Sequence, residues 1–189
     1  MSANTIDINQ RMNRFDRHHS VWLFGYGSLI YKADFPFIQR RPARIHHWVR
    51  RFWQGSHDHR GTPEAPGRVL TLASQPGAVC EGMAYLITPQ EFEHLDRREK
   101  NGYLRLATAI EFADGEQVEG LFYVAREDNS AYLGPATETE IAAQIAAAQG
   151  PSGSNRDYVL HLATALRQLG EDDAHVFAIE RYLNNRGTD

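Results

Sequence analysis

The order of strand-like and helix-like segments is the feature that most constrains the fold of this chain. Runs rich in β-branched and aromatic residues come first, and helical patterns gather late. Strands followed by helices favour an α+β fold over one in which strands and helices alternate. The expected strands are 21–24, 43–52, 68–73, 79–87, 103–112 and 118–124.

Three helices are expected in the last third of the chain. Residues 137–140, Thr-Glu-Thr-Glu, have the form of a capping box and open an alanine-rich helix. Ser154 is expected to cap a second helix that Gly170 ends. Asp172 or Asp173 then opens a third helix.

Length and composition are those of one globular domain. The chain has 189 residues, of which 42% are hydrophobic, and this is enough to form a core. We expect an N-terminal arm over residues 1–20, either loose or a short peripheral helix, and one domain over residues 21–189. The formal net charge of −4 creates no basic field that would recruit nucleic acid or an anionic membrane.

Cysteine content and hydropathy narrow the class of protein further. Cys80 is the only cysteine, so neither an intramolecular disulfide nor a cysteine-based zinc site is expected. A small buried side chain is the expected role of Cys80, rather than a nucleophile. Residues 1–20 lack the apolar run of a secretory signal, and no later run is long enough to span a bilayer. We therefore expect a cytoplasmic protein.

A glycine-rich turn follows the first expected strand. Residues 25–30, Gly-Tyr-Gly-Ser-Leu-Ile, contain two glycines of a dinucleotide fingerprint, but Ile30 occupies the position of the third. No Gly-Lys-Ser/Thr follows, which excludes a P-loop, and Ser28 lacks the flanking glycines of a nucleophile elbow. The glycines leave main-chain N–H groups open to an approaching anion. The alternative is a tight turn without a binding role.

A short helix inside the strand region carries a candidate catalytic carboxylate. Residues 88–91, Thr-Pro-Gln-Glu, predict its N-terminal capping box. Helical spacing then places Glu99 on the apolar face, between Phe92 and Leu95 in projection. Burial would raise the pKa of the Glu99 carboxyl and suit it to take and return a proton near neutral pH.

A structural role for Glu99 is the alternative. In that case the side chain would face solvent at the helix end, or would pair with an arginine such as Arg98 or Arg105. The nine histidines offer little support for a metal site. His46 and His47 would point to opposite faces of a strand, and no third ligand with suitable spacing joins the pair His57 and His59. We expect no metal.

Four ordered motifs resemble those of the γ-glutamylcyclotransferase superfamily, in particular its ChaC-like, glutathione-specific branch. Together they cover the chain from about residue 21 to residue 169. The motifs are 23–29 (Leu-Phe-Gly-Tyr-Gly-Ser-Leu), 60–69 (Arg-Gly-Thr-Pro-Glu-Ala-Pro-Gly-Arg-Val), 97–103 (Arg-Arg-Glu-Lys-Asn-Gly-Tyr) and 150–155 (Gly-Pro-Ser-Gly-Ser-Asn), which leads into Tyr158.

The resemblance implies a small mixed β-barrel with helices packed around it. It implies that Glu99 is the catalytic residue and that the glycine loop holds a γ-glutamyl group, largely through main-chain groups. Tyr103 and Tyr158 resemble supporting tyrosines near the substrate. The implied binding residues of the loop are Leu23, Phe24, Gly25, Tyr26, Gly27, Ser28 and Leu29.

The implied reaction is an intramolecular aminolysis, a lyase-type step in glutathione degradation. The α-amine of glutathione attacks its own γ-carbonyl, which closes the ring of 5-oxoproline and expels cysteinylglycine. The enzyme must hold these groups in a near-attack geometry. Glu99 would take the proton of the amine and return it to the leaving nitrogen, and donors of Gly27 and Ser28 could bind the α-carboxylate or the oxyanion. No metal or organic cofactor is required.

Two other functions remain open to the sequence. One is cyclotransferase activity on another γ-glutamyl amino acid or amine, although the Arg-Gly-Thr-Pro-Glu sequence at 60–64 is characteristic of the glutathione-specific branch. The other is a non-catalytic γ-glutamyl-binding module linked to cation transport, although binding alone gains little from an uncompensated buried carboxylate. Arg60 and Arg68 are candidates to bind the glycine carboxylate of glutathione. The sequence makes no prediction of oligomeric state.

Overall fold

The structure is a computed structural model that describes residues 4–12 and 14–185. Its residues cluster into two compact units. The first unit is Met1–Val49 with Ser74–Ser130, and the second is Arg50–Ala73 with Ala131–Asp189.

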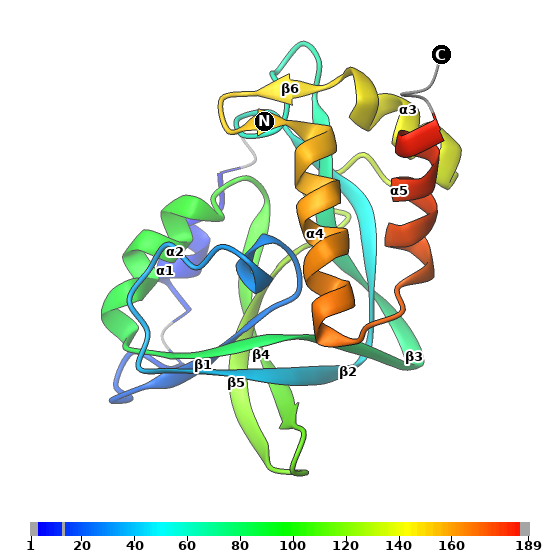
Figure 1. Ribbon diagram of the computed structural model, residues 1–189. Helices are drawn as coiled ribbons and strands as arrows, with labels where there is room; N and C mark the ends of the chain where they lie inside the picture. Colours follow the sequence, from blue (N-terminus) through cyan, green and yellow to red (C-terminus); the bar gives the residue numbers. More distant parts are fainter. Residues whose placement is uncertain (1–3, 13, 186–189) are drawn as a thin grey trace. The chain divides into compact units, whose positions relative to one another are not determined.

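A closed, mixed β-barrel organises the first unit (Figure 1). Its strand order is β1-β3-β2-β4-β5. Strand β1 pairs antiparallel with β3 and parallel with β5, and this makes the barrel mixed. The predicted α+β fold with a small mixed barrel is therefore confirmed. The strands are β1 (Val21–Gly25), β2 (Gln39–Ser56), β3 (Gly67–Ile87), β4 (Tyr103–Phe112) and β5 (Gln117–Ala125), of which β2 and β3 continue into the second unit.

Apolar side chains from different strands fill the barrel. Leu23 of β1, Ile45 of β2, Ile110 of β4 and Leu121 of β5 are all fully buried. These residues stand in the strand-like runs of the sequence, where β-branched and large apolar residues suit a pleated surface with one buried face. The register of the strands follows, because a shift by one residue would turn these side chains outward.

Two of the expected strands form one continuous strand. The predicted runs 68–73 and 79–87 are both parts of β3. Between them Gly77 has a φ of +82°, and its N–H donates to Nδ1 of His47, which itself has a φ of 70° on β2. Facing irregularities of this kind are typical of a bulge, at which a strand can bend and still continue through glycine and proline.

Short helices accompany the barrel strands in the first unit. They are α1 (Ile6–Gln10), α2 (Phe92–Arg98) and 3-10 turns at Ser28–Ile30 and Pro89–Glu91. The predicted capping box at residues 88–91 is wrong, because the Thr88 side chain accepts no capping hydrogen bond. The N–H of Glu91 instead donates to the carbonyl of Thr88 at 3.0 Å, which closes a 3-10 turn and delays the α-helix until Phe92.

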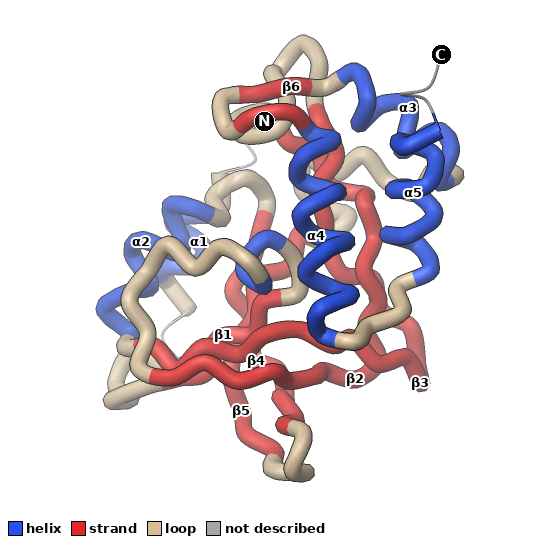
Figure 2. The backbone as a smooth tube through the Cα atoms, viewed as in Figure 1, coloured by secondary structure: helices blue, strands red, loops and turns tan. Residues whose placement is uncertain are grey.

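Helices α3, α4 and α5 of the second unit contact one another (Figure 2). The predicted capping box of α3 is confirmed at Thr137 and Glu140, and the predicted cap of α4 is confirmed at Ser154. Asp173, rather than Asp172, accepts a hydrogen bond from the first turn of α5. The elements are α3 (Glu138–Ala147), α4 (Asn155–Leu169), α5 (Ala174–Asn185) and a small hairpin of β6 (Gln149–Gly150) and β7 (Gly153–Ser154).

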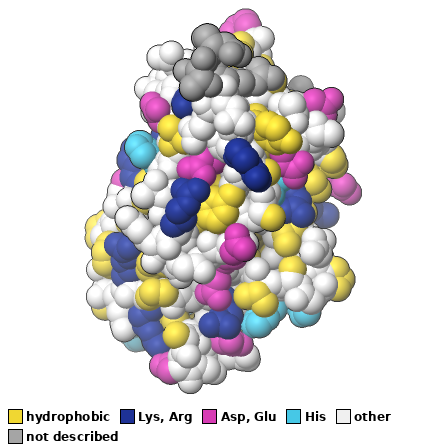
Figure 3. All heavy atoms as spheres, turned by 45° about the vertical axis from the view of Figure 1, so that its right-hand side comes forward, with side chains coloured by type: hydrophobic (Ala, Val, Ile, Leu, Met, Phe, Trp, Pro, Cys, Tyr) yellow, Lys and Arg dark blue, Asp and Glu magenta, His cyan; other side chains and the backbone are white. Residues whose placement is uncertain are grey.

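Basic and acidic side chains are interspersed on the face shown in Figure 3. Hydrophobic side chains lie singly or in small groups among them. Within residues 4–12 and 14–185, no helix has both the length and the apolar character that a bilayer crossing requires.

Burial of His175 makes stability depend on pH. Its Nε2 atom accepts a hydrogen bond from the main-chain N–H of Phe52 at 3.1 Å, and its Nδ1 atom lies 3.3 Å from Glu138. Burial lowers the pKa of His175 below its ordinary value of 6.5. The unfolded chain therefore binds the proton more readily, so stability is highest above pH 6.5 and is lost as the pH falls from 6.5 toward the lower pKa of the folded state.

We expect the free energy of unfolding contributed by His175 to fall by about 1 kcal/mol per pH unit just below the ordinary histidine pKa. Urea denaturation of the wild type and of His175→Gln at about pH 7.5 and about pH 5.5 measures this. The glutamine oxygen can still accept the Phe52 hydrogen bond but takes up no proton, so the variant should lose less stability at the lower pH. Equal losses in the two proteins would contradict the role of His175.

Candidate active site

The glycine-rich turn lies directly at the end of β1. Gly25 is the last residue of the strand, and a Cβ atom there would lie 2.5 Å from the Cβ of Leu29. Only glycine fits that approach without displacing the turn. Gly27 follows and leads into the 3-10 turn Ser28–Ile30. This close approach explains why position 25 is glycine. From the sequence alone, the predicted reason was that glycine leaves main-chain N–H groups open to an anion.

Two tyrosine hydroxyls hold this turn in place. The Tyr26 hydroxyl donates to the main-chain carbonyl of Tyr123 at 2.7 Å, and the Tyr85 hydroxyl donates to the carbonyl of Leu29 at 2.5 Å. Both Tyr26 and Tyr85 are buried. Leu23 and Phe24, which were also predicted to bind substrate, lie within the β1 ladder and have buried side chains. The turn is therefore a rigid feature built on the barrel.

Glu99 lies just beyond the end of α2. It is the C-terminal cap residue of the helix, with φ −95° and ψ 15°. Its side chain is 18% exposed, so it lies at the edge of the buried helix face rather than fully within it. The helix becomes α-helical only at Phe92 and ends at Arg98, which leaves Glu99 at the rim. The buried carboxylate of α2 is Asp96, which is 1% exposed.

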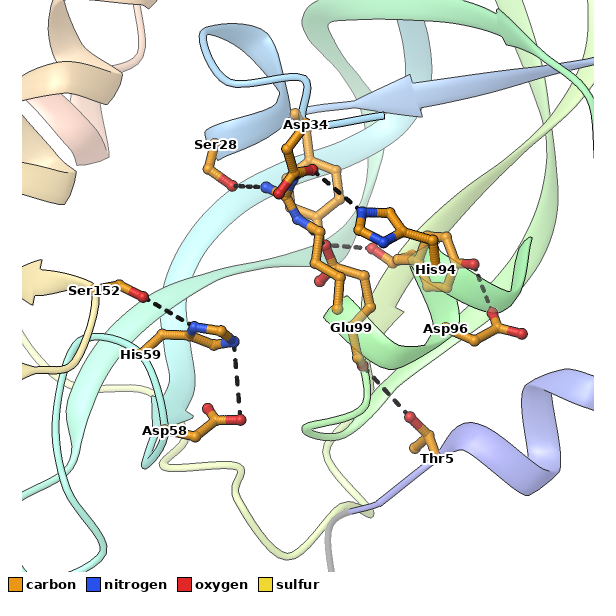
Figure 4. A network of polar contacts seen from close by, with 12 residues as sticks. Thr5, Ser28, Asp34, Asp58, His59, His94, Asp96, Glu99 and Ser152 are labelled. Atoms are coloured by element: carbon orange, nitrogen blue, oxygen red, sulfur yellow. Dashed lines mark hydrogen bonds and ion pairs between the residues drawn. The ribbon is translucent and has the colours of Figure 1, made fainter. Parts of the chain in front are cut away.

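Arg98 connects Glu99 to the glycine-rich turn. Glu99 and Ser28 are labelled in Figure 4. The Nη2 atom of Arg98 donates to the Ser28 hydroxyl at 3.0 Å, and its Nε atom lies 3.2 Å from Oε1 of Glu99. Its Nη1 atom pairs with Asp34, and Asp34 also lies 3.8 Å from Nε2 of His94. One guanidinium thus brings together two motifs that lie 70 residues apart in the sequence. Of the two arginines considered as partners for Glu99, Arg98 is the one that pairs with it.

A cluster of buried polar side chains, Asp96, Tyr123 and Arg105, links α2 to strands β4 and β5. The Tyr123 hydroxyl donates to Asp96 at 2.6 Å, and Nε of Arg105 lies 3.8 Å from the same carboxylate. Burial raises the pKa of Asp96, against the opposing effects of the Tyr123 hydrogen bond and the Arg105 charge. Burial and the neighbouring Asp96 also raise the pKa of Tyr123 well above its ordinary value. The cluster fixes α2 but is closed to a substrate.

The two predicted tyrosines lie in different units. Tyr103 is the first residue of β4, four positions after Glu99, and its side chain is 9% exposed. Tyr158 belongs to α4 in the second unit. There its ring packs edge-on against Phe52, with the ring centroids 6.1 Å apart, and lies 5.7 Å from the guanidinium of Arg60.

Arg68 has a structural role in the second unit. Its guanidinium donates to the carbonyls of Phe52 at 2.9 Å and Gly134 at 3.0 Å, and to Oε1 of Gln144 at 2.6 Å. The residue is 7% exposed. These bonds use donors that a substrate carboxylate would need, which counts against Arg68 as the residue that binds the glycine carboxylate. The other candidate, Arg60, is half-buried beside Tyr158.

Sequence reasoning missed Asp34, Asp96 and Tyr123. Asp96 could have been found, because it follows Phe92 by four positions and therefore lies on the apolar face of the helix. Asp34 and Tyr123 had no such signal, since their roles depend on which distant elements meet α2. The histidines are dispersed, and among the described residues no group of three or more His, Cys, Asp or Glu side chains is arranged to hold a metal ion.

The arrangement suits acid/base chemistry on an anionic small molecule. Glu99 is partly exposed, so a substrate proton can reach it, whereas Asp96 is enclosed. The turn that follows β1 offers main-chain groups beside it, and Arg98 fixes the Glu99 carboxylate relative to Ser28. These features define a class of barrel protein with a glycine-rich turn joined through an arginine to a partly exposed carboxylate.

Comparison with known proteins places the chain within that class. The family model described as ChaC-like protein matches residues 21–186. The chain belongs to the ChaC-like family.

Relatives with assigned names are similar over most of their length. Gamma-glutamylcyclotransferase 2-3 of Arabidopsis thaliana is 46% identical over 169 residues, which are 83% of this chain and 85% of that protein. Glutathione-specific gamma-glutamylcyclotransferase 1 of Danio rerio is 41% identical over 176 residues, which are 87% of this chain and 89% of that protein. A crystal structure of a γ-glutamyl cyclotransferase specific to glutathione from yeast has a TM-score of 0.82 and 32% identity, and the match covers 89% of this chain and 97% of that one.

Proposed function

We propose that this protein is a glutathione-specific γ-glutamylcyclotransferase. It converts the γ-glutamyl group of glutathione to 5-oxoproline and releases cysteinylglycine. Membership of the ChaC-like family and the names of its relatives support this activity. The observation that carries the proposal is the link from Glu99 through Arg98 to the glycine-rich turn, because it joins the proposed acid/base group to the turn proposed to hold the γ-glutamyl group.

The proposed reaction needs only one acid/base group. The substrate α-ammonium loses a proton to the Glu99 carboxylate, and the free amine attacks the γ-carbonyl carbon. A new C–N bond closes the ring, and the bond to the cysteinyl nitrogen breaks. Glu99 returns its proton to that leaving nitrogen, and the second proton of the attacking nitrogen passes to the released amine of cysteinylglycine or to water, so the enzyme ends in its starting state. Because both reacting groups belong to one molecule, most of the acceleration comes from holding it folded.

The glycine-rich turn is proposed to hold the γ-glutamyl group. Main-chain N–H groups near Gly27 and Ser28 would bind the α-carboxylate or the oxyanion that forms at the γ-carbonyl. Tyr26 and Tyr85 anchor the turn, so its groups need little reorganisation when charge develops. We propose that the protein acts in the cytoplasm. The proposed reaction requires no metal or organic cofactor.

Product analysis with reduced glutathione tests the proposal. NMR or mass spectrometry should detect 5-oxoproline and cysteinylglycine in equal amounts, with turnover of γ-glutamylalanine and γ-glutamylamines at least about 100-fold slower. Preferred turnover of those other compounds would leave the mechanism standing and overturn the assignment of substrate. Binding of glutathione without any product would favour a non-catalytic γ-glutamyl-binding module.

Replacing Arg98 tests the link between the two motifs. Arg98→Met removes its contacts with Ser28, Asp34 and Glu99, and we expect kcat/KM to fall about 10- to 100-fold because the carboxylate loses its fixed orientation. Arg97→Met is the matched control, since the neighbouring Arg97 pairs with the exposed Glu93 in the same helix. Steady-state kinetics with glutathione measure both, and equal activity in the two variants would contradict the role of Arg98.

A further inference from the structure

The N-terminal arm contacts the segment that carries Glu99. Helix α1 packs against α2 and β4 (Figure 1). Two polar side chains of this arm, Thr5 and Asn9, are 6% and 0% exposed. Both lie before residue 21, where the match to the ChaC-like family begins. Buried polar groups need hydrogen-bond partners, and these two find them on the main chain around Glu99.

Thr5 binds the end of α2. Its N–H donates to the main-chain carbonyl of Lys100 at 2.9 Å, and its hydroxyl donates to the same oxygen at 3.1 Å. The hydroxyl also lies 3.5 Å from the carbonyl oxygen of Glu99, the contact drawn in Figure 4. The last carbonyls of a helix lack donors from within the helix. Thr5 of the arm supplies such donors to the carbonyls of Glu99 and Lys100, directly after the last residue of α2.

Asn9 binds the start of β4. Its Nδ2 atom donates to the carbonyl of Tyr103 at 3.0 Å, and its Oδ1 atom accepts from the N–H of Arg105 at 2.9 Å. This amide therefore engages the pair of main-chain groups that a neighbouring strand would engage. The Arg105 side chain donates in return to the carbonyl of Asn9 at 2.7 Å.

We infer that Thr5 and Asn9 are positioning residues for the Glu99 carboxylate. The inference rests on the proposed role of Glu99 as general acid/base. Residues 99–102 connect α2 to β4, and the arm binds this connection at Lys100 and the start of β4 at Tyr103. A general acid/base must stay within hydrogen-bond reach of its proton, and a displacement of about 1 Å lowers a rate about 100-fold.

Steady-state kinetics of full-length variants test the inference. Thr5→Val and Asn9→Ala should each lower kcat for glutathione about tenfold or more and leave KM within about twofold, because the glycine-rich turn is untouched. Thr5→Ser keeps the hydroxyl and should restore the wild-type kcat. Gln10→Ala is the matched control, since Gln10 is an exposed neighbour in α1.

A destabilised control separates positioning from folding. Ile179→Val removes one buried methyl group from α5, and residue 179 belongs to the second unit rather than to the arm. All variants are assayed at a temperature at which circular dichroism shows them folded. Wild-type kcat in both Thr5→Val and Asn9→Ala would overturn the inference. A loss of kcat in Ile179→Val as large as theirs would overturn it as well.

Hydrogen exchange tests the same inference without activity. The N–H of Glu99 donates to the carbonyl of Leu95 at 2.9 Å, and the N–H of Gly102 donates to Lys100 at 3.0 Å. Both amides should exchange faster in Thr5→Val and Asn9→Ala, whereas the amide of Leu121 in β5 should not change. Unchanged exchange at Glu99 and Gly102 would overturn the inference whatever the activity. A wild type without cyclotransferase activity would contradict the proposed function alone.

Discussion

Replacing Glu99 by glutamine is expected to lower kcat for 5-oxoproline formation from glutathione by about 10³-fold. The glutamine amide keeps the size and polarity of the side chain but cannot take the proton of the substrate amine. The carboxylate of Asp96 cannot substitute for it, because Asp96 is enclosed beneath α2 and bonded to Tyr123. Single-turnover measurements of 5-oxoproline formation would give the rate of the chemical step directly.

Glu93→Gln is the matched control for that experiment. Glu93 is an exposed carboxylate on the same helix, and its partner in the structure is Arg97. Its replacement should leave kcat within about twofold of the wild type, and both variants should keep the thermal midpoint within a few degrees. Retention of most of the activity in Glu99→Gln would exclude Glu99 as the acid/base and would direct attention to another group near the glycine-rich turn.

Replacing Arg68 by methionine is expected to lower the free energy of unfolding by about 3 kcal/mol. The guanidinium bonds the carbonyls of Phe52 and Gly134 and the side chain of Gln144 inside the second unit. Methionine has a similar length but no donors, so these buried acceptors lose their partners and incur a desolvation cost. Urea denaturation followed by circular dichroism measures the change.

Arg60→Met separates this structural role from substrate binding. Arg60 is half-buried and donates to the carbonyl of Ser154 at 3.1 Å, so its replacement should cost at most about 1 kcal/mol. If Arg60 rather than Arg68 binds a carboxylate of glutathione, Arg60→Met should also raise the KM for glutathione. Equal losses of stability in Arg60→Met and Arg68→Met would contradict the distinction between the two arginines.

Local signals in the sequence were sufficient for most elements of the fold. The capping box at Thr137, the cap at Ser154 and the glycine at the end of α4 were all found, because each depends on residues within one turn of the helix. The continuity of β3 was not found, because Gly77 and His47 form their irregularity across two strands. The capping box predicted at residues 88–91 does not form. The main-chain carbonyl of Thr88 accepts the hydrogen bond from the N–H of Glu91 that the Thr88 side chain was expected to accept.

The sequence by itself determined the order of strands and helices, the glycine-rich turn after β1 and the candidacy of Glu99. Each of these depends on residue types at short spacing, which local sterics and hydrogen bonding govern. Only the tertiary structure decided that Asp96 is buried and Glu99 accessible, that Arg98 joins Glu99 to Ser28, and that Thr5 binds the end of α2. The partners in the last two contacts lie 70 and 95 residues apart, so their pairing depends on how the folded elements meet.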